Sequence, residues 1–189
     1  KFNFAEVDAL GKTTLDSKWL KWHVQHVLDL KLVDSNLIKN AELKIAVDGV
    51  NSSGGVAIPL LLEAMGVEVV KVHCEPTGDF AHNPEPLPGN LRDLSEAVTT
   101  HHCDLGISVD PDVDRLCFVN EDGTFFGEEY TLVAVADYVL SKTPGNTVSN
   151  LSSTRALSVV TEKHGGKYTA SAVGEVNVVE TIRMTDAII

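Results

Sequence analysis

The sequence predicts an α/β fold: a three-layer α/β/α domain with a mixed, mainly parallel sheet, followed by part of a second similar domain. Short apolar segments at 43–47 and 67–72 enclose a helical segment at 56–65. This alternation is typical of parallel strands that are covered by helices. The same order of strand, helix, glycine and strand returns over 147–171, which suggests a repeated α/β unit.

The elements follow the chain in order. A first helix has an apolar face, and the tryptophans beside it, Trp19 and Trp22, are expected to lie in the core or at a domain interface. Gly66 ends the helix 56–65, in which Pro59 is expected in the first turn. The apolar face of the first helix consists of Leu20, Val24, Val27 and Leu28.

The second half of the first unit contains a loop, a helix and a strand pair. A loop rich in proline and glycine, 73–90, is long enough to be functional, and a helix, 91–102, follows it. Strands are expected at 104–109 and 115–120. The glycine-rich turn 49–55 is interpreted as a close-packing device rather than an anion cradle, and no role is predicted for His73, His82 or His164.

The bulk composition excludes some partners. The net charge of −12 and pI of about 4.9 disfavour nucleic acid and anionic membranes. No apolar run approaches the ~20 residues that span a bilayer, and the three cysteines form no close pair, which favours reduced thiols and a cytoplasmic location. The chain begins with Lys1 rather than Met, and 186–189 resembles the start of a buried strand. We therefore expect an interior piece of a longer enzyme.

The strongest functional signal is an aspartate loop between two strands. Asp110, Asp112 and Asp114 alternate over five positions and would repel one another without a cation. Oxygen ligands select a hard ion, most simply Mg²⁺, and three ligands leave coordination positions open for catalysis. Arg115 adds a guanidinium that can hold a phosphate or a sugar hydroxyl beside the metal.

Two alternatives of other classes remain open. A non-enzymatic calcium-binding module of the EF-hand type would use the same aspartates with Glu121, but it requires glycine where Arg115 stands and helices around the loop. A Mg²⁺-dependent phosphatase would need a nucleophilic aspartate in a D-x-D-x-T motif, which the sequence does not contain.

The loop 110–115 resembles the metal loop of the α-D-phosphohexomutase family, which includes phosphomannomutase, phosphoglucomutase and phosphoglucosamine mutase. The segments 44–55 and 78–86 are similar to the first strand with its glycine turn and to the proline-rich loop of the family's second domain. The segments 152–155 and 173–177 resemble parts of the family's third domain. The resemblance implies a linker, 1–12, the metal-loop domain II, 13–124, and an incomplete domain III, 125–189.

The family resemblance implies four domains around one cleft and an enzyme that interconverts hexose 1-phosphate and hexose 6-phosphate. A phosphoserine in the first domain would form a hexose 1,6-bisphosphate intermediate, with Mg²⁺ held by the aspartates. The family's serine motif is absent from this sequence, so the chain alone is expected to be inactive. Which hexose phosphate is the substrate stays open.

The resemblance also points to further site residues. Arg115, Ser153 and Arg155 match positions expected to contact substrate. Some family members carry a lysine where Ser152 stands and a histidine where Glu175 stands, both proposed to handle protons. Glu175 could act as the general acid and base here, or it could be a first-turn carboxylate favoured by a helix dipole.

Overall fold

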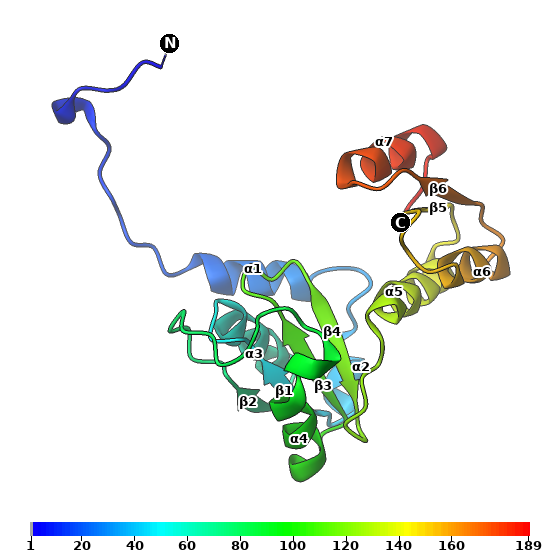
Figure 1. The fold of residues 1–189 in the computed structure, drawn as a ribbon, viewed down its shortest axis with the longest axis horizontal. Coiled ribbons are helices and arrows are strands. Elements are labelled where there is room, and N and C mark those ends of the chain that lie inside the picture. The colour runs from blue at the N-terminus through cyan, green and yellow to red at the C-terminus, as the bar shows by residue number, and fades with distance from the viewer. Residues whose placement is uncertain (1) are drawn as a thin grey trace.

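A computed structural model describes residues 2–189 (Figure 1). Its main sheet has four strands in the order β2-β1-β3-β4. The strand β1 is parallel to β2 and β3, and β4 is antiparallel to β3. The prediction of a mixed, mainly parallel sheet is confirmed. The strands are β1 (Lys44–Asp48), β2 (Glu68–Val72), β3 (Leu105–Val109) and β4 (Leu116–Asn120).

Helices cover both faces of this sheet. Successive side chains of β1 point to opposite sides, and the apolar ones on each side are buried in a separate cluster. Ala46 belongs to a buried cluster with Leu94 and Val98 of α4 (Arg92–His101). Ile45 and Val47 belong to a second cluster, which includes Leu62 of α3 (Gly54–Ala64), Met65 and Val67. The domain therefore has the expected three layers, with α3 and α4 on opposite faces (Figure 1).

Two helices extend the layer of α3. In α1 (Trp19–Leu28), Val24 is buried, but Trp19 and Trp22 are 57% and 55% exposed. The two indoles do not lie in the core and pack edge to face on each other at 5.9 Å. The other alternative, a position at a domain interface, stays a prediction. Helix α2 (Ser35–Asn40) was not predicted, and it begins where the Leu37 N–H donates to the Asp34 carboxylate at 2.9 Å.

The glycine turn before α3 is built by close packing, as expected. A Cβ on Gly55 would lie 2.4 Å from the carbonyl oxygen of Cys74, and one on Gly49 would lie 2.3 Å from Gly55 Cα. The helix begins at Gly54, and Pro59 is its sixth residue. The expected first-turn position of Pro59 is wrong, because this tight turn starts the helix two residues earlier.

The second unit begins with α5 (Glu128–Lys142) and contains a two-stranded parallel sheet. Leu140 of α5 and Leu157 of α6 are fully buried. The expected strand at 186–189 is only begun: Asn146 and Ala187 form a parallel bridge, and the Val148 N–H donates to the Ile189 carbonyl at 2.7 Å. It is not fully buried, because Ile188 is 45% exposed. The other elements are β5 (Thr147–Asn150), α6 (Ala156–Lys163), β6 (Tyr168–Ser171) and α7 (Glu175–Thr185).

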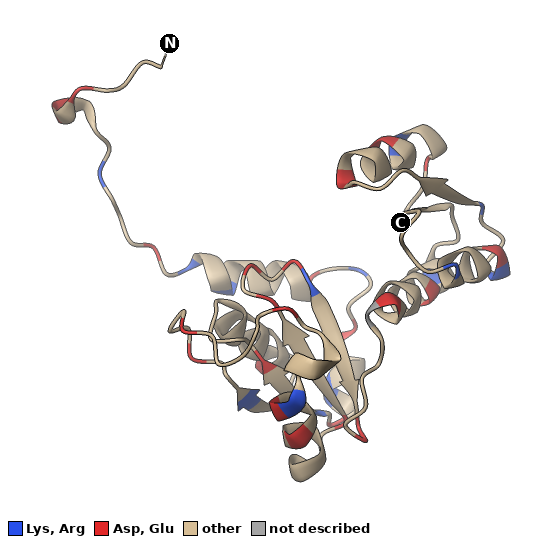
Figure 2. Ribbon diagram, viewed as in Figure 1, with Lys and Arg blue, Asp and Glu red and all other residues tan. Residues whose placement is uncertain are grey.

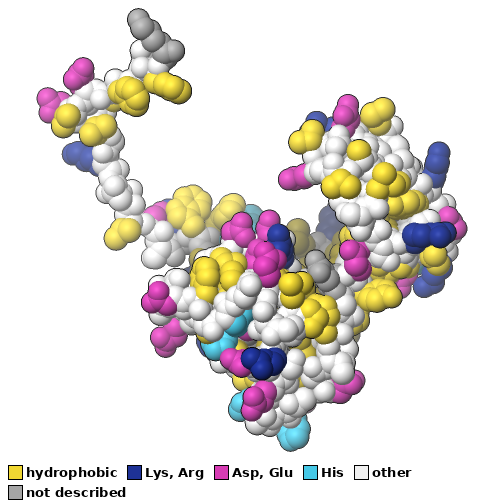
Figure 3. Space-filling model, viewed as in Figure 1, with side chains coloured by type: hydrophobic (Ala, Val, Ile, Leu, Met, Phe, Trp, Pro, Cys, Tyr) yellow, Lys and Arg dark blue, Asp and Glu magenta, His cyan; other side chains and the backbone are white. Residues whose placement is uncertain are grey.

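The segment before α1 runs away from the sheet and is exposed, with one 3-10 turn at Val7–Ala9 (Figure 1). A second 3-10 turn, η2 (Pro88–Asn90), precedes α4. Among the described residues, none of the helices has the length and apolar character that a membrane span requires. Lys and Arg side chains are scattered between acidic ones on the face shown in Figure 3.

Candidate metal centre

The three aspartates of the loop 110–115 converge at the carboxyl end of β3. One carboxylate oxygen from each of Asp110, Asp112 and Asp114 lies within 4.8 Å of the others. Asp110 is 7% exposed, whereas Asp112 and Asp114 are open to solvent. Figure 2 shows acidic residues on the loop that joins β3 to β4. The structure thus brings together the predicted metal ligands in an arrangement that a small cation can bridge.

Asp110 also shapes the loop. Its Oδ1 accepts the backbone N–H groups of Asp114 and Arg115 at 3.1 and 3.0 Å. Its carbonyl accepts the N–H of Val113, which adopts a left-handed conformation with a φ of 63°. Both side-chain bonds of the loop use Oδ1, so neither of these N–H groups binds the other carboxylate oxygen, Oδ2.

The carboxylates of the loop affect one another's ionisation. Burial raises the pKa of Asp110, but hydrogen bonds from the Arg115 N–H and from the Asp114 and Asp112 side chains lower it below its ordinary value. The pKa of Asp114 is raised, first by its side-chain hydrogen bond to Asp110 and then by the charges of Asp112 and Asp110. Ionised carboxylates this close repel one another, and their oxygens are ligands of the kind that a hard divalent cation prefers.

Arg115 lies between this loop and the proline-rich loop. One terminal nitrogen of its guanidinium pairs with Glu85. Its Nε is 4.0 Å from Asp110 Oδ2 and 4.0 Å from Asp114 Oδ1. The side chain is 52% exposed, so it remains accessible to an anion from solution.

A buried acid and a histidine anchor the proline-rich loop. Asp48, at the end of β1, is fully buried, and its Oδ2 lies 2.9 Å from His82 Nε2. Its Oδ1 accepts the Val50 N–H at 2.9 Å. Sequence reasoning assigned no role to His82 and did not single out Asp48 or Glu85. The available signal was Asp48 at the end of an apolar strand, because a carboxylate that is buried there requires a partner such as His82.

The other predicted site residues lie in the second unit. Ser153 and Arg155 follow β5, and Glu175 follows β6 as the first residue of α7. Because β5 and β6 are parallel, these residues lie at the same edge of their sheet. Ser153 Oγ is 3.3 Å from Asn150 Oδ1, while Arg155 and Glu175 are exposed. Glu175 lines a hollow on α7 with Val176, Val179, Glu180 and Arg183.

The surroundings of the loop contradict the calcium-binding alternative. That alternative required helices on both sides of 110–121, and the structure has β3 before the aspartates and β4 from Leu116 to Asn120. The aspartate loop therefore joins two antiparallel strands, which is incompatible with an EF-hand.

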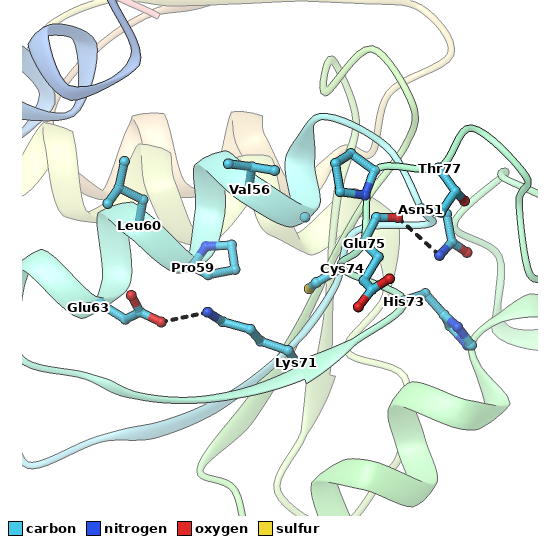
Figure 4. A pocket seen from close by; sticks show the side chains of 12 residues that line it. Asn51, Val56, Pro59, Leu60, Glu63, Lys71, His73, Cys74, Glu75 and Thr77 are labelled. Atoms are coloured by element: carbon cyan, nitrogen blue, oxygen red, sulfur yellow. Dashed lines mark hydrogen bonds and ion pairs between the residues drawn. The ribbon is translucent and has the colours of Figure 1, made fainter. Parts of the chain in front are cut away.

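A separate hollow of about 710 Å³ lies beside α3 and β2 (Figure 4). Its basic side chains are already engaged: Lys71 pairs with Glu63 at 2.9 Å, and His73 Nε2 lies 2.9 Å from Asp93. None of the predicted site residues lines this hollow, so we distinguish it from the aspartate loop.

Comparison with known proteins places the chain in a family. Residues 21–123 match the family model for phosphoglucomutase/phosphomannomutase alpha/beta/alpha domain II, and residues 127–189 match the model for domain III. A probable phosphoglucosamine mutase from Methanopyrus kandleri is 35% identical over 178 residues, which are 93% of this chain and 38% of that protein. A phosphoglucomutase/phosphomannomutase from Thermococcus kodakarensis is 34% identical over 152 residues, covering 79% of this chain and 33% of the relative.

A solved structure agrees with these matches. The crystal structure of a phosphoglucomutase/phosphomannomutase family protein from Burkholderia thailandensis superposes with a TM-score of 0.77 at 29% identity, over 89% of this chain and 36% of that one. The chain thus spans less than half the length of these relatives. With the aspartate loop at the end of β3 and both domain models matched, this chain belongs to the phosphoglucomutase/phosphomannomutase family.

Proposed function

We propose that the protein containing this chain is a Mg²⁺-dependent phosphohexomutase. It interconverts hexose 1-phosphate and hexose 6-phosphate through a phosphoserine and a hexose 1,6-bisphosphate. The observation that carries the proposal is the gathering of three carboxylates within 4.8 Å in a member of this family. The names of the relatives, which include phosphoglucomutase and phosphoglucosamine mutase, support a hexose phosphate as substrate. We expect the enzyme to work in the cytoplasm.

The aspartates fit a small hard cation. Asp110 would contribute Oδ2, because Oδ1 already accepts two backbone N–H groups, and the exposed Asp112 and Asp114 would contribute one oxygen each. When bound, Mg²⁺ would neutralise negative charge on the phosphoryl group in transfer. The tight loop keeps the three side chains together before the cation arrives and so reduces the ordering that binding requires.

The other residues would bind and orient the sugar phosphate. Arg115 would offer a guanidinium fork to phosphate, and Ser153 and Arg155 would contact the sugar phosphate from the end of β5. Glu175 would hold or move the proton of a sugar hydroxyl. This sequence does not contain the family's serine motif, so we expect the 189-residue chain alone to have no mutase activity.

A coupled mutase assay tests this function. The longer gene product and the 189-residue chain would receive mannose, glucose or glucosamine 1-phosphate with Mg²⁺ and a trace of the sugar bisphosphate. We expect an active longer protein, a silent chain, and a ranking of the three sugars. Asp112→Asn in the longer protein should lower kcat by at least about tenfold, whereas the exposed Glu121→Gln serves as the charge-matched control. A longer protein that turns over none of the sugars while its serine is phosphorylated would rule out the assignment.

A further inference from the structure

Arg115 is a cation that lies close to the proposed metal ligands. Its Nε is 4.0 Å from Asp110 Oδ2 and from Asp114 Oδ1, at the outer limit of an ion pair. Asp110 Oδ2 is also the oxygen that the backbone leaves available for a cation, since both loop N–H groups bind Oδ1. A small movement of the guanidinium would give it direct hydrogen bonds to both carboxylates. Arg115 and a divalent cation would then compete for the same oxygens.

Glu85 holds Arg115 in its present position. The Glu85 carboxylate pairs with a terminal nitrogen of the guanidinium, on the part of the side chain that extends beyond Nε. Such a partner draws the guanidinium toward the proline-rich loop and satisfies part of its charge. The pair is half-exposed, with exposed side-chain fractions of 52% and 49%, so its stabilisation is modest and easily exchanged.

The loop fixes Glu85 from both sides. The Glu85 N–H donates to Asn83 Oδ1 at 3.1 Å, and its carbonyl accepts from Asn90 Nδ2 at 2.8 Å. The carbonyl of Asn83 accepts from His82 Nδ1 at 2.7 Å, and His82 is anchored by the buried Asp48. This chain of contacts ties Glu85 to the end of β1, next to β3 in the sheet.

We propose that Glu85 is a positioning residue that keeps the Arg115 guanidinium off Asp110 and Asp114, so that these carboxylates stay available to a divalent cation. The inference rests on the proposed function for the role of the aspartates as metal ligands. It adds that the proline-rich loop controls cation affinity through Arg115 without contacting the metal.

Mn²⁺ binding to the 189-residue chain tests the proposal, since free Mn²⁺ is measured by its paramagnetic resonance signal without any activity. Glu85→Gln removes the charge and keeps the shape of the side chain. We expect a loss of Mn²⁺ affinity of about two- to fivefold, the range of one exposed ion pair. Glu75→Gln, an exposed carboxylate on the same loop, is the control and should bind Mn²⁺ as the wild type does. Thermal melts of each variant check that it is folded.

A second background separates this role from simple attraction between Glu85 and the metal. In Arg115→Gln chains the competing cation is gone, so Mn²⁺ affinity should rise and the further change Glu85→Gln should have almost no effect. An equal loss from Glu85→Gln in both backgrounds would overturn the proposal, because it would show a direct charge effect. If the wild-type chain and Arg115→Gln both bind no Mn²⁺, the metal assignment itself fails, and this proposal with it.

Discussion

The hydroxyl of Tyr138 donates a hydrogen bond to the carbonyl of Leu32 at 2.8 Å. Tyr138 belongs to α5, and Leu32 lies in the turn between α1 and α2. The two residues also line an apolar hollow of about 410 Å³ together with Val27, Leu37 and Met65. This bond therefore links the helix that opens the second unit to the helices covering the first sheet.

Tyr138→Phe removes this bond and keeps the aromatic ring. We expect a loss of about 0.5–1 kcal/mol in unfolding free energy, because an exposed neutral hydrogen bond contributes little. Urea denaturation measures the change, and the midpoint should fall while the m-value stays constant. Tyr130→Phe, which removes an exposed hydroxyl from the same helix, is the control. Equal effects of the two substitutions would show that the bond to Leu32 does not stabilise the chain.

Asp114→Asn is expected to stabilise the cation-free chain at neutral pH. The raised pKa of Asp114 arises from its hydrogen bond to Asp110 and from the charges of Asp112 and Asp110. The folded chain therefore binds this proton more tightly than the unfolded chain, and the ionised carboxylate destabilises the fold once the pH exceeds that pKa. In EDTA at pH 7 the variant should have a higher Tm than the wild type, and the difference should disappear as the pH falls below the pKa of Asp114.

Asp110 provides the control, because its pKa is shifted in the direction opposite to that of Asp114. Its carboxylate accepts two backbone N–H groups, and its pKa is lowered. Asp110→Ala leaves both donors without this acceptor and should cost about 1–3 kcal/mol at neutral pH. A lower Tm for Asp114→Asn in EDTA would contradict the idea that repulsion within the loop is relieved by a cation.

The sheet was predictable because its strands are short apolar segments with clear glycine and proline boundaries. Helix α2 was missed because its six residues, Ser35–Asn40, show no apolar periodicity. For Trp19 and Trp22, which are exposed here, the sequence did not separate the core from a domain interface, because an indole at the edge of an apolar stripe suits either place. The apolar pattern of a segment thus predicts the presence of a helix or strand better than it predicts which of its side chains are buried.

The aspartates of the site were predictable because they are close in sequence, and β3 directly positions all three. The contacts of Asp48 with His82 and of Glu85 with Arg115 join residues 34 and 30 positions apart. No sequence period encodes such contacts, because they depend on the path of the proline-rich loop over the sheet. The local part of a site can therefore be read from one sequence, whereas the partners that orient it require the fold.

Asp137 makes the second unit sensitive to acid. It accepts hydrogen bonds from His164 Nε2 at 2.6 Å and Lys163 Nζ at 3.1 Å, and these, His164 first, lower its pKa below the ordinary 3.8. A depressed pKa contributes stability that is present above the unfolded value and is lost as the pH falls through the folded one. The Tm of the wild type should exceed that of Asp137→Asn at pH 6, and the difference should vanish in stronger acid. Glu121→Gln should show no such pH-dependent difference.

Gly55→Ala tests the close packing that starts α3. The new Cβ would lie 2.4 Å from the carbonyl oxygen and 2.6 Å from the Cα of Cys74, so backbone must move apart. This separation moves the start of α3 away from the residues that follow β2. We expect it to cost about 1–3 kcal/mol in unfolding free energy. Gly89→Ala is the control, since its Cβ would meet nothing within 4 Å, and it should be neutral or slightly stabilising. A Gly55→Ala chain as stable as the wild type would show that the turn has room, and the anion-binding interpretation of its glycines would then be the better one.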